Sequence, residues 1–407
     1  MTDDFSGRRR CDSFGRRIQW SNPVGWRGVR RLILLTMFIV GVTRVSNAQS
    51  QKLTFRSLSP IDAHAHSFNA ASEFYALLDR LNLRILNICV VDKYERGYEE
   101  AAPQHAKALE IFHGSHGRAA WCSTFDPQDW ESPGFADRTI QGLDKTFQDG
   151  AIAVKIYKSI GMELKSKDGK YLMLDNPVFA PLLEFIAEHN RTLVAHIAEP
   201  SAAWKPLDPA SPHYSYYKAN PDWHMYLHPE RPSKEAILAA RDRMVKQHPK
   251  LRVVGAHLGS MEDDVDQIAR RFDALPNFAV DTAARVPDLM LQPREKVRAF
   301  LIKYQDRVLY ATDLVSMPWD KLAETMKHWE EEYARDWKFF ATDETLTYDG
   351  HTVRGLALPA PGIRKLFHNN ALSWIPGLSN SSRGGKSKAP SSGHLQTRPF
   401  FANVPCL

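Results

Sequence analysis

Two histidines near the start of the chain have a spacing that suits a metal site. His64 and His66 lie in the run Pro60-Ile-Asp62-Ala-His-Ala-His-Ser67, directly after an apolar lead-in. If this run is a strand, residues two apart project from the same side, so both imidazoles point one way. Two imidazoles side by side form half of a site for a divalent ion. The alternative is a pair of surface histidines in a loop.

Three further titratable side chains follow apolar, strand-like runs. His196 ends Leu-Val-Ala-His, His257 ends Val-Val-Gly-Ala-His, and Asp313 ends Val-Leu-Tyr-Ala-Thr-Asp. The carboxyl ends of parallel strands meet at one edge, where α/β barrels carry their active sites. A single buried histidine is usually a satisfied core residue. Three such strand ends, together with His64 and His66, predict a metal site instead.

The elements that must position these side chains alternate between short β-rich runs and amphipathic helical stretches. In 264–275, for example, apolar residues recur at helical spacing behind an acidic first turn. Eight such units over about 250 residues predict a (β/α)8 TIM barrel, although a doubly wound open sheet would show the same alternation. The strands are expected at Ser59–His64, Leu83–Val91, Ala119–Phe125, Ala151–Tyr157, Arg191–Ile197, Leu251–Leu258, Asn277–Thr282 and Arg307–Thr312.

Two stretches interrupt this rhythm and predict insertions after strands 5 and 8. Residues 199–232 are rich in proline and aromatics, and they follow the fifth strand on the catalytic face of a barrel. They are expected to form either a lid or wall of the substrate site or a packed loop whose aromatics only cover the barrel. Residues 319–340 predict a long helix with one apolar, core-facing stripe, and a hairpin turning at Asp349-Gly350 is expected next.

The ends of the chain differ in composition from its middle. Residues 1–48 contain an arginine-rich segment, the apolar run Leu32–Val42 and Ser46-Asn47-Ala48, an order typical of a signal peptide. The apolar run is shorter than the roughly 20 residues of a membrane-spanning helix, so no stable membrane insertion is expected after cleavage near Ala48. Export to the periplasm or the extracellular space is therefore predicted. Residues 378–407 are rich in Ser, Gly, Lys and Pro and predict a disordered tail.

The basic charge of the chain belongs to this leader. The whole chain has 53 Lys+Arg and 47 Asp+Glu, a net charge of +6. Residues 1–48 contain nine arginines and three aspartates, so 44 residues of each sign remain and the rest of the chain is neutral. No overall positive field is left to attract nucleic acid. The expected partner is a small-molecule substrate, and a homodimer is compatible with the sequence.

Residues 58–376 resemble the amidohydrolase superfamily, most closely its amidohydrolase-2 branch. The resemblance rests on Asp62-Ala-His64-Ala-His66, Val-Ala-His196, Gly-Ala-His257-Leu-Gly, Tyr-Ala-Thr-Asp313 and Asn370-Ala-Leu. It implies a (β/α)8 barrel with a divalent ion at the mouth, zinc first and manganese as the alternative. The ligands implied by position are His64, His66, His196 and Asp313. Asp313 and His257 are the implied catalytic residues, with Asp313 acting as general base and then general acid.

The number of metal ions depends on Lys155. This residue lies in the fourth predicted strand, where two-metal members of the superfamily place a bridging carboxylated lysine. His257 and Lys155 would then complete a second site. The alternative is an amine that pairs with Asp62 or binds a substrate anion. One ion is favoured, because the resemblance is to the amidohydrolase-2 branch, whose members usually have a one-metal site.

Three functions are compatible with these residues. The first is metal-dependent hydrolysis of a C–N or C–O bond in an amide, cyclic amide, lactone or ester. The second is non-oxidative decarboxylation or hydration of an aromatic or unsaturated carboxylic acid. The third is ligand binding without turnover, which the complete ligand set disfavours. Arg285 and Lys158 are candidate cations for a substrate carboxylate, and ordinary solvated charges are the alternative for both.

We predict that the mature exported protein begins near Gln49, because a small-residue cleavage site precedes it. Intact-mass analysis of protein from the native host measures this directly. A mature cytoplasmic form that still carries residues 1–48 would contradict the prediction.

Overall fold

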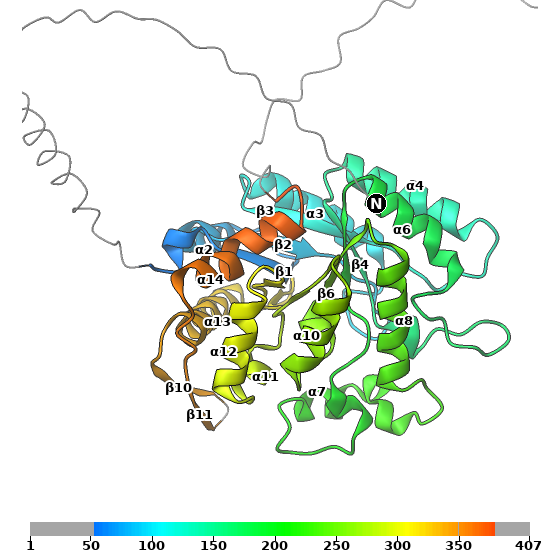
Figure 1. Cartoon of the computed structure of the whole chain (residues 1–407). Helices are drawn as coiled ribbons and strands as arrows, with labels where there is room; N and C mark the ends of the chain where they lie inside the picture. Colours follow the sequence, from blue (N-terminus) through cyan, green and yellow to red (C-terminus); the bar gives the residue numbers. More distant parts are fainter. Residues whose placement is uncertain (1–52, 349, 379–407) are drawn as a thin grey trace, which may run out of the picture. The chain divides into compact units, whose positions relative to one another are not determined.

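The computed structural model describes residues 53–348 and 350–378, and both the predicted leader and nearly all of the predicted tail lie outside them. The described part is a ring of parallel strands surrounded by helices (Figure 1). Its strands are β1 (Ile61–Ser67), β2 (Arg84–Ile88), β3 (Ala119–Thr124), β4 (Ala153–Ile156), β5 (Thr192–Ala195), β6 (Arg252–Gly255), β7 (Phe278–Asp281), β8 (Val308–Leu309) and β9 (Val315–Ser316). All eight predicted strands are confirmed within a few residues of the expected bounds.

The strand order decides between the two folds that the alternation allowed. Strands β1 to β8 lie next to one another in chain order, and all pairs are parallel. The last segment then reaches back to the first strand. The backbone N–H of Ala63 donates to Tyr310 O at 3.0 Å, and that of His66 donates to Leu314 O at 2.8 Å. Because one segment thus borders both β7 and β1, the sheet closes and the TIM barrel is confirmed.

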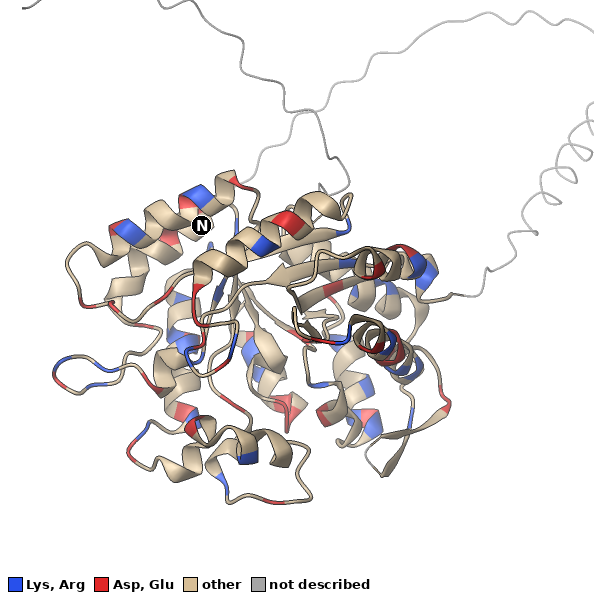
Figure 2. Cartoon of the chain, turned by 180° about the vertical axis from the view of Figure 1, so that it is seen from behind, with Lys and Arg blue, Asp and Glu red and all other residues tan. Residues whose placement is uncertain are grey.

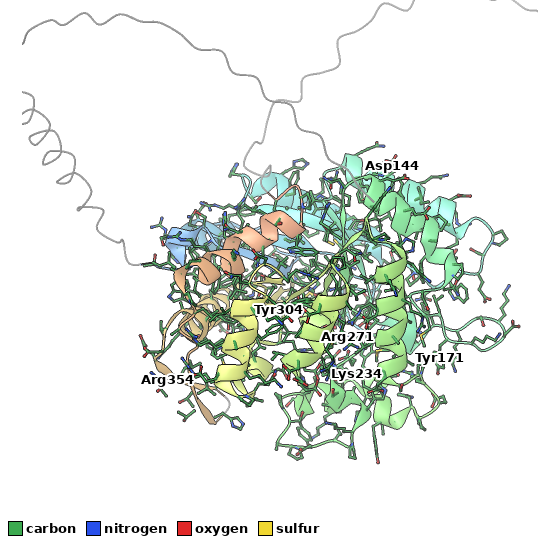
Figure 3. All side chains as sticks on the ribbon, in the orientation of Figure 1. Asp144, Tyr171, Lys234, Arg271, Tyr304 and Arg354 are labelled. Atoms are coloured by element: carbon green, nitrogen blue, oxygen red, sulfur yellow. The ribbon has the colours of Figure 1, made fainter. Side chains whose placement is uncertain are left out.

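The helices follow the strands and cover the outside of the ring. They are α2 (Ser72–Leu81), α3 (Ala101–Gly114), α4 (Phe135–Gln148), α5 (Ser159–Met162), α6 (Ala180–Glu188), α8 (Lys234–Gln247), α9 (Ala256–Gly259), α10 (Val265–Ala274), α11 (Val286–Met290) and α12 (Arg294–Lys303). Helix α10 begins where the sequence predicts, because the Asp264 side chain accepts from the N–H of Asp266 and caps it. Arg271 of α10 donates to Asp242 of α8 at 2.9 Å and joins these two neighbouring helices (Figure 3).

Two further groups of elements lie after β5 and after β9 in the described part of the chain. Between β5 and α8 lie η3 (Ser201–Trp204), α7 (Tyr214–Ala219), η4 (Pro221–Trp223) and η5 (Met225–Leu227). After β9 come α13 (Leu322–Ala341), the hairpin β10 (Thr345–Tyr348) and β11 (His351–Arg354), α14 (Ala360–Arg364), the π-helix η6 (Lys365–Asn369) and α15 (Asn370–Trp374). Tyr348 lies opposite His351, in agreement with the predicted two-residue turn. Short helical turns at Arg56–Leu58 and Pro177–Phe179 lie elsewhere in the chain.

The core has two layers separated by the sheet. The outer layer lies between the strands and the helices, and the inner layer fills the barrel with small residues such as Ala120, Ala153 and Ala279. The apolar stripe of α13 belongs to the outer layer, as predicted, because Trp329 is fully buried there. Charged residues of both signs are spread over the helices (Figure 2). Among the described residues, no helix is long and apolar enough to cross a membrane.

A bulge in β1 turns the two motif histidines toward the barrel mouth. Ala63 packs in the inner core layer, whereas Ala65, two residues later, packs in the outer one. The pairing register with β2 shifts between Asp62 and Ala65, which accounts for this break in alternation. His64 and His66 therefore share the inner side, as their spacing predicts.

We predict that Trp329→Ala destabilises the protein by about 3–5 kcal/mol, because it leaves a cavity between α13 and the barrel. Trp319→Ala is the matched control, since Trp319 is 48% exposed and its ring contacts mainly the guanidinium of Arg96. Denaturant unfolding of both variants measures the difference. Equal destabilisation by the two substitutions would contradict the assignment of α13 to the core.

Candidate active site

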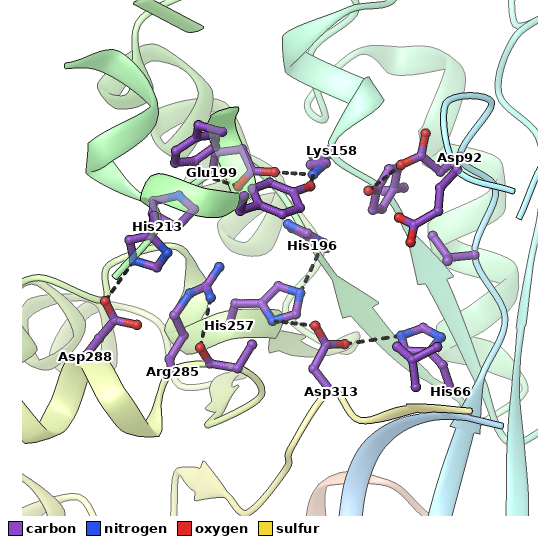
Figure 4. A pocket seen from close by; sticks show the side chains of 18 of the residues that line it. His66, Asp92, Lys158, His196, Glu199, His213, His257, Arg285, Asp288 and Asp313 are labelled. Carbon is purple, nitrogen blue, oxygen red and sulfur yellow. Dashed lines mark hydrogen bonds and ion pairs between the residues drawn. The ribbon is translucent and has the colours of Figure 1, made fainter. Parts of the chain in front are cut away.

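The predicted site residues line one cavity at the carboxyl ends of the strands. The cavity has a volume of about 350 Å³ (Figure 4). Seven of the predicted residues line it, namely His66, Lys155, Lys158, His196, His257, Arg285 and Asp313. His64 is fully buried against this group. The fold thus brings together side chains from β1 and β4 and from the segments that follow β4, β5, β6, β7 and β8.

Three of these side chains are placed to hold a metal ion. The ligand atoms of His64, His66 and Asp313 all lie within 4.8 Å of one another. Asp313 Oδ1 is 3.3 Å from the Nε2 atom of each histidine. Two imidazole nitrogens and a carboxylate oxygen are a donor set that zinc and related divalent ions prefer.

The hydrogen bonds of both histidines suit metal binding. His64 Nδ1 donates to Asp281 Oδ2 at 2.9 Å, and His66 Nδ1 donates to the carbonyl oxygen of Ile88 at 2.8 Å. Because the proton is held on Nδ1 in both rings, each Nε2 presents a lone pair toward Asp313. Burial lowers the pKa of His64 well below its ordinary value, so this ring is neutral at pH 7, the form that binds metal.

Asp281 is a site residue that the sequence reasoning missed. It ends β7, and its Oδ1 accepts from the backbone N–H of His257 at 2.8 Å while its Oδ2 accepts from His64. Burial raises the pKa of this carboxyl. The signal was available in the sequence, because Phe-Ala-Val-Asp281 is an apolar strand ending on a titratable group, as in the strands that end at His196 and His257.

Asp62, the first residue of the motif, holds the segment that carries Asp313. Its carboxylate accepts from Thr312 Oγ1 at 2.5 Å, from Thr312 N at 3.1 Å and from the hydroxyl of Tyr333 at 2.9 Å. Burial raises its pKa to about 7. Asp313 follows with a left-handed backbone (φ 66°), and its N–H donates to His64 O at 2.8 Å. Asp62 is therefore a positioning residue that fixes the candidate base against β1.

His196 and His257 form a second pair in contact with the first group. His257 Nδ1 donates to Ala283 O at 3.0 Å and lies 3.9 Å from Asp313 Oδ2. Its Nε2 therefore accepts from His196 Nδ1 at 3.1 Å. His196 Nε2 keeps a lone pair that finds no hydrogen-bond partner in the described part of the chain. His196 thus lies outside the three-residue group but keeps a nitrogen free to bind metal, and its role as fourth ligand stays a prediction.

The electrostatic state of this second pair follows from its burial. Burial lowers the pKa of His257 to about 3 and that of His196 well below its ordinary value. Both rings are therefore neutral at pH 7. His257 and Leu258 have left-handed backbones (φ 59° and 58°), a costly conformation for residues other than glycine. The N–H of His257 donates to Asp281 in this conformation, which stabilises the turn that aims its ring into the cavity.

Lys155 reaches the metal group directly. Its Nζ lies 3.0 Å from His64 Nε2, and burial lowers its pKa to about 8. It makes no ion pair with Asp62, whose carboxylate accepts from Thr312, from the hydroxyl of Tyr333 and from the backbone N–H of His64 instead. The alternative in which Lys155 pairs with Asp62 is therefore wrong. Its role in a second metal site stays a prediction.

The two candidate cations for a substrate carboxylate have different surroundings. Lys158 is buried, forms an ion pair with Glu199 and donates to the hydroxyl of Tyr216 at 2.8 Å. Arg285 is 9% exposed, donates from Nη1 to Ala284 O at 2.9 Å and has a buried Nε without a partner among the described residues. Neither is an ordinary solvated charge. Arg285 is the better candidate, because it has no ion pair within the described chain.

The segment after β5 contributes one wall of the cavity. Tyr216 and Tyr217 line it, and the hydroxyl of Tyr217 donates to Glu199 at 2.9 Å. His213 pairs with Asp288 of α11 at 2.9 Å, which ties this segment to the one after β7. These contacts favour the substrate wall over a packed loop remote from the site.

The family comparison agrees with this geometry. A family model described as amidohydrolase matches residues 61–376. The chain belongs to the amidohydrolase family. This is the amidohydrolase-2 branch that the motifs resemble, an enzyme family whose members are metal-dependent. No curated protein matches the sequence.

Solved structures of low sequence identity also align with the chain. An uncharacterised TIM-barrel protein from Bordetella bronchiseptica has 12% identity and a TM-score of 0.44, covering 79% of this chain and 99% of its own. A 2,6-dihydroxybenzoate decarboxylase from Rhizobium has 12% identity and a TM-score of 0.44, with coverages of 78% and 98%. A probable 2-pyrone-4,6-dicarboxylic acid hydrolase from Acinetobacter baumannii has 11% identity and a TM-score of 0.43, with coverages of 78% and 99%.

We predict that Asp281→Asn weakens zinc binding by roughly 10–100-fold, because the amidohydrolase loses the carboxylate that holds the proton on His64 Nδ1. Competition with a chromophoric chelator measures the affinity. Asp168→Asn is the matched control, because Asp168 is exposed and remote from the cavity. Unchanged zinc affinity in a folded Asp281→Asn variant would contradict the orienting role.

Proposed function

We propose that this amidohydrolase hydrolyses a C–N or C–O bond in a small amide, cyclic amide, lactone or ester. The observation that carries the proposal is the position of the Asp313 carboxylate. Its Oδ1 lies 3.3 Å from both His64 and His66 Nε2, while its Oδ2 faces the ring of His257 at 3.9 Å. One carboxylate thus borders the metal group and the second pair of histidines at once.

The donor set fits a divalent ion, with zinc first and manganese as the alternative. His64, His66 and Asp313 would hold it, and His196 Nε2 is the proposed fourth ligand. When bound, such an ion supplies Lewis acidity that polarises a carbonyl group and makes a water molecule more acidic at neutral pH. One ion is proposed, because three close ligand atoms form one group among the described residues.

Asp313 is the proposed proton carrier. Burial raises the pKa of this carboxyl, but the neighbouring His257, His64 and His66 outweigh that effect and hold it well below its ordinary value. The carboxylate is therefore ionised at neutral pH and can accept the proton of the attacking water. It can then give this proton to the leaving group as the bond breaks. Its side chain is 28% exposed toward the cavity, so a substrate can reach it.

His257 and Lys155 flank the reacting centre on the remaining sides. His257 donates from Nδ1 to Ala283, which fixes the plane of its ring beside Asp313. A neutral imidazole held in this way is a positioning group that borders the Asp313 carboxylate and the ring of His196. Lys155 reaches from β4 to Nε2 of His64, the same nitrogen that faces Asp313.

A second candidate function rests on Arg285. A buried guanidinium without an ion pair suits a substrate carboxylate, which an aromatic or unsaturated acid would provide. Non-oxidative decarboxylation or hydration of such an acid is therefore the alternative reaction. A screen of lactones, amides and aromatic acids separates the two. Acid release without carbon dioxide supports the hydrolase, and carbon dioxide release supports the alternative.

The proposed location follows from the leader. The order of arginines, apolar residues and small residues in 1–48 supports export, and the substrate would then be met outside the cytoplasm.

We predict that Asp313→Asn retains much of the metal but loses roughly 10²–10⁴ in kcat, because the amide keeps a coordinating oxygen and cannot accept a proton. Activity should not recover at high pH, since the amide does not ionise there. His196→Ala should instead lower metal content and activity together, because it removes a neutral ligand. Elemental analysis and steady-state kinetics on the same preparations measure both quantities.

The exposed Asp168→Asn variant again serves as control, and it should leave metal content and kcat unchanged. An Asp313→Asn enzyme with full metal and nearly wild-type kcat would show that Asp313 does not carry the proton. A His196→Ala enzyme with full metal would remove His196 from the ligand set.

A further inference from the structure

The charged side chains that line the cavity are mostly paired with one another. Lys158 forms an ion pair with Glu199, and His213 forms one with Asp288. Asp313 and Lys155 belong to the metal group. Once these are set aside, one cation and two carboxylates remain without an ion pair among the described residues. They are Arg285, Asp92 and Glu95.

The two unpaired carboxylates belong to the segment between β2 and α3. Asp92 is 5% exposed and accepts from the hydroxyl of Tyr157 at 2.7 Å and from the N–H of Tyr94 at 2.9 Å, both neutral donors. Glu95 lies at the exposed rim of the cavity. Burial and the charge of Asp92 raise the pKa of Glu95. Two acidic groups that disfavour each other at one end of a cavity are a place where a cation would be stabilised.

The unpaired cation lies at the other end. Arg285 is nine-tenths buried and keeps an Nε without a partner in the described chain. Figure 4 shows Arg285 and Asp92 on opposite sides of the cavity, with His257 and Asp313 between them. The candidate reacting centre thus separates an anion-binding end from a cation-binding end.

Aromatic rings add to the cation-binding end. Tyr98 and Tyr157 line the same wall as Asp92, and Tyr157 donates its hydroxyl to that carboxylate. Aromatic faces attract ammonium groups, and Lys158 Nζ already lies 5.2 Å from the centroid of the Tyr157 ring. An alkylammonium group would therefore meet both carboxylates and the ring of Tyr98 there.

We propose that the substrate is zwitterionic, with a carboxylate held by Arg285 and a cationic group held by Asp92 and Glu95, on either side of the bond that is cleaved. This deepens the proposed function and rests on it, because it names the substrate class of the same cavity. An amide or ester that carries an amino group on one side and a carboxylate on the other belongs to this class.

Binding of unreactive probes tests the proposal without requiring turnover. The zinc-loaded full chain is titrated calorimetrically with 6-aminohexanoate and other ω-amino acids of graded length, and with the matched hexanoate and hexylamine. The best ω-amino acid should bind at least about tenfold more tightly than the acid or the amine of the same length, because it satisfies both ends of the cavity. Equal binding of the ω-amino acids and the simple acids would overturn the proposal.

Two variants test which residue binds the ammonium group and which binds the carboxylate of the probe. Glu95→Gln should remove most of the advantage of the ω-amino acid over hexanoate and leave hexanoate binding unchanged. Arg285→Gln should remove its advantage over hexylamine. Glu100→Gln is the matched control, because Glu100 is exposed on the same segment and does not line the cavity. Because Glu95 is exposed, its substitution spares the fold even if Arg285→Gln does not.

The outcomes separate this proposal from the proposed function. Tight ω-amino acid binding that Glu95→Gln weakens supports the substrate class even if the reaction proves to be decarboxylation. Hydrolysis of neutral or purely acidic substrates, with no effect of Glu95→Gln on binding or KM, would overturn the substrate class and leave the hydrolase standing.

Discussion

The rest of the site depends on the buried carboxylate of Asp281. It comes from β7, yet it accepts from the ring of His64 on β1 at 2.9 Å and from the backbone of His257 after β6 at 2.8 Å. A buried carboxylate is costly unless it is hydrogen-bonded, and these two donors together with the N–H of Ala283 at 3.3 Å satisfy it. One side chain therefore fixes the tautomer of a candidate metal ligand and the strained turn that carries a candidate acid-base group. The barrel must close for this contact to form.

Much of this arrangement could be predicted from the sequence, because the chemistry lies where apolar strands end. The runs before His196, His257 and Asp313 are local patterns, and a barrel brings local strand ends to one mouth. Asp281 ends β7 and obeys the same rule, and the apolar run Phe-Ala-Val before it is the local pattern that indicates it. The bulge between Asp62 and Ala65 could not be predicted, because it depends on pairing with β2 rather than on its own residues.

Ion pairs between residues that are far apart in the sequence could not be predicted either. Lys158 was predicted as a cation for substrate, but the structure pairs it with Glu199, which comes from the segment after the next strand. Nothing in the spacing of the two residues indicates that contact. The same holds for His213 and Asp288, which join the segment after β5 to helix α11. The net charge after the leader is zero, and the proposed substrate class rests on the unpaired acidic and basic side chains within the cavity.

The central claim is that His64, His66 and Asp313 hold a divalent ion at the mouth of the barrel. Anomalous scattering at the zinc edge, from crystals of the zinc-loaded protein, tests it most directly. The account predicts one strong peak within bonding distance of both Nε2 atoms and an Asp313 oxygen. A zinc-loaded protein whose only peak lies away from these three residues would contradict it.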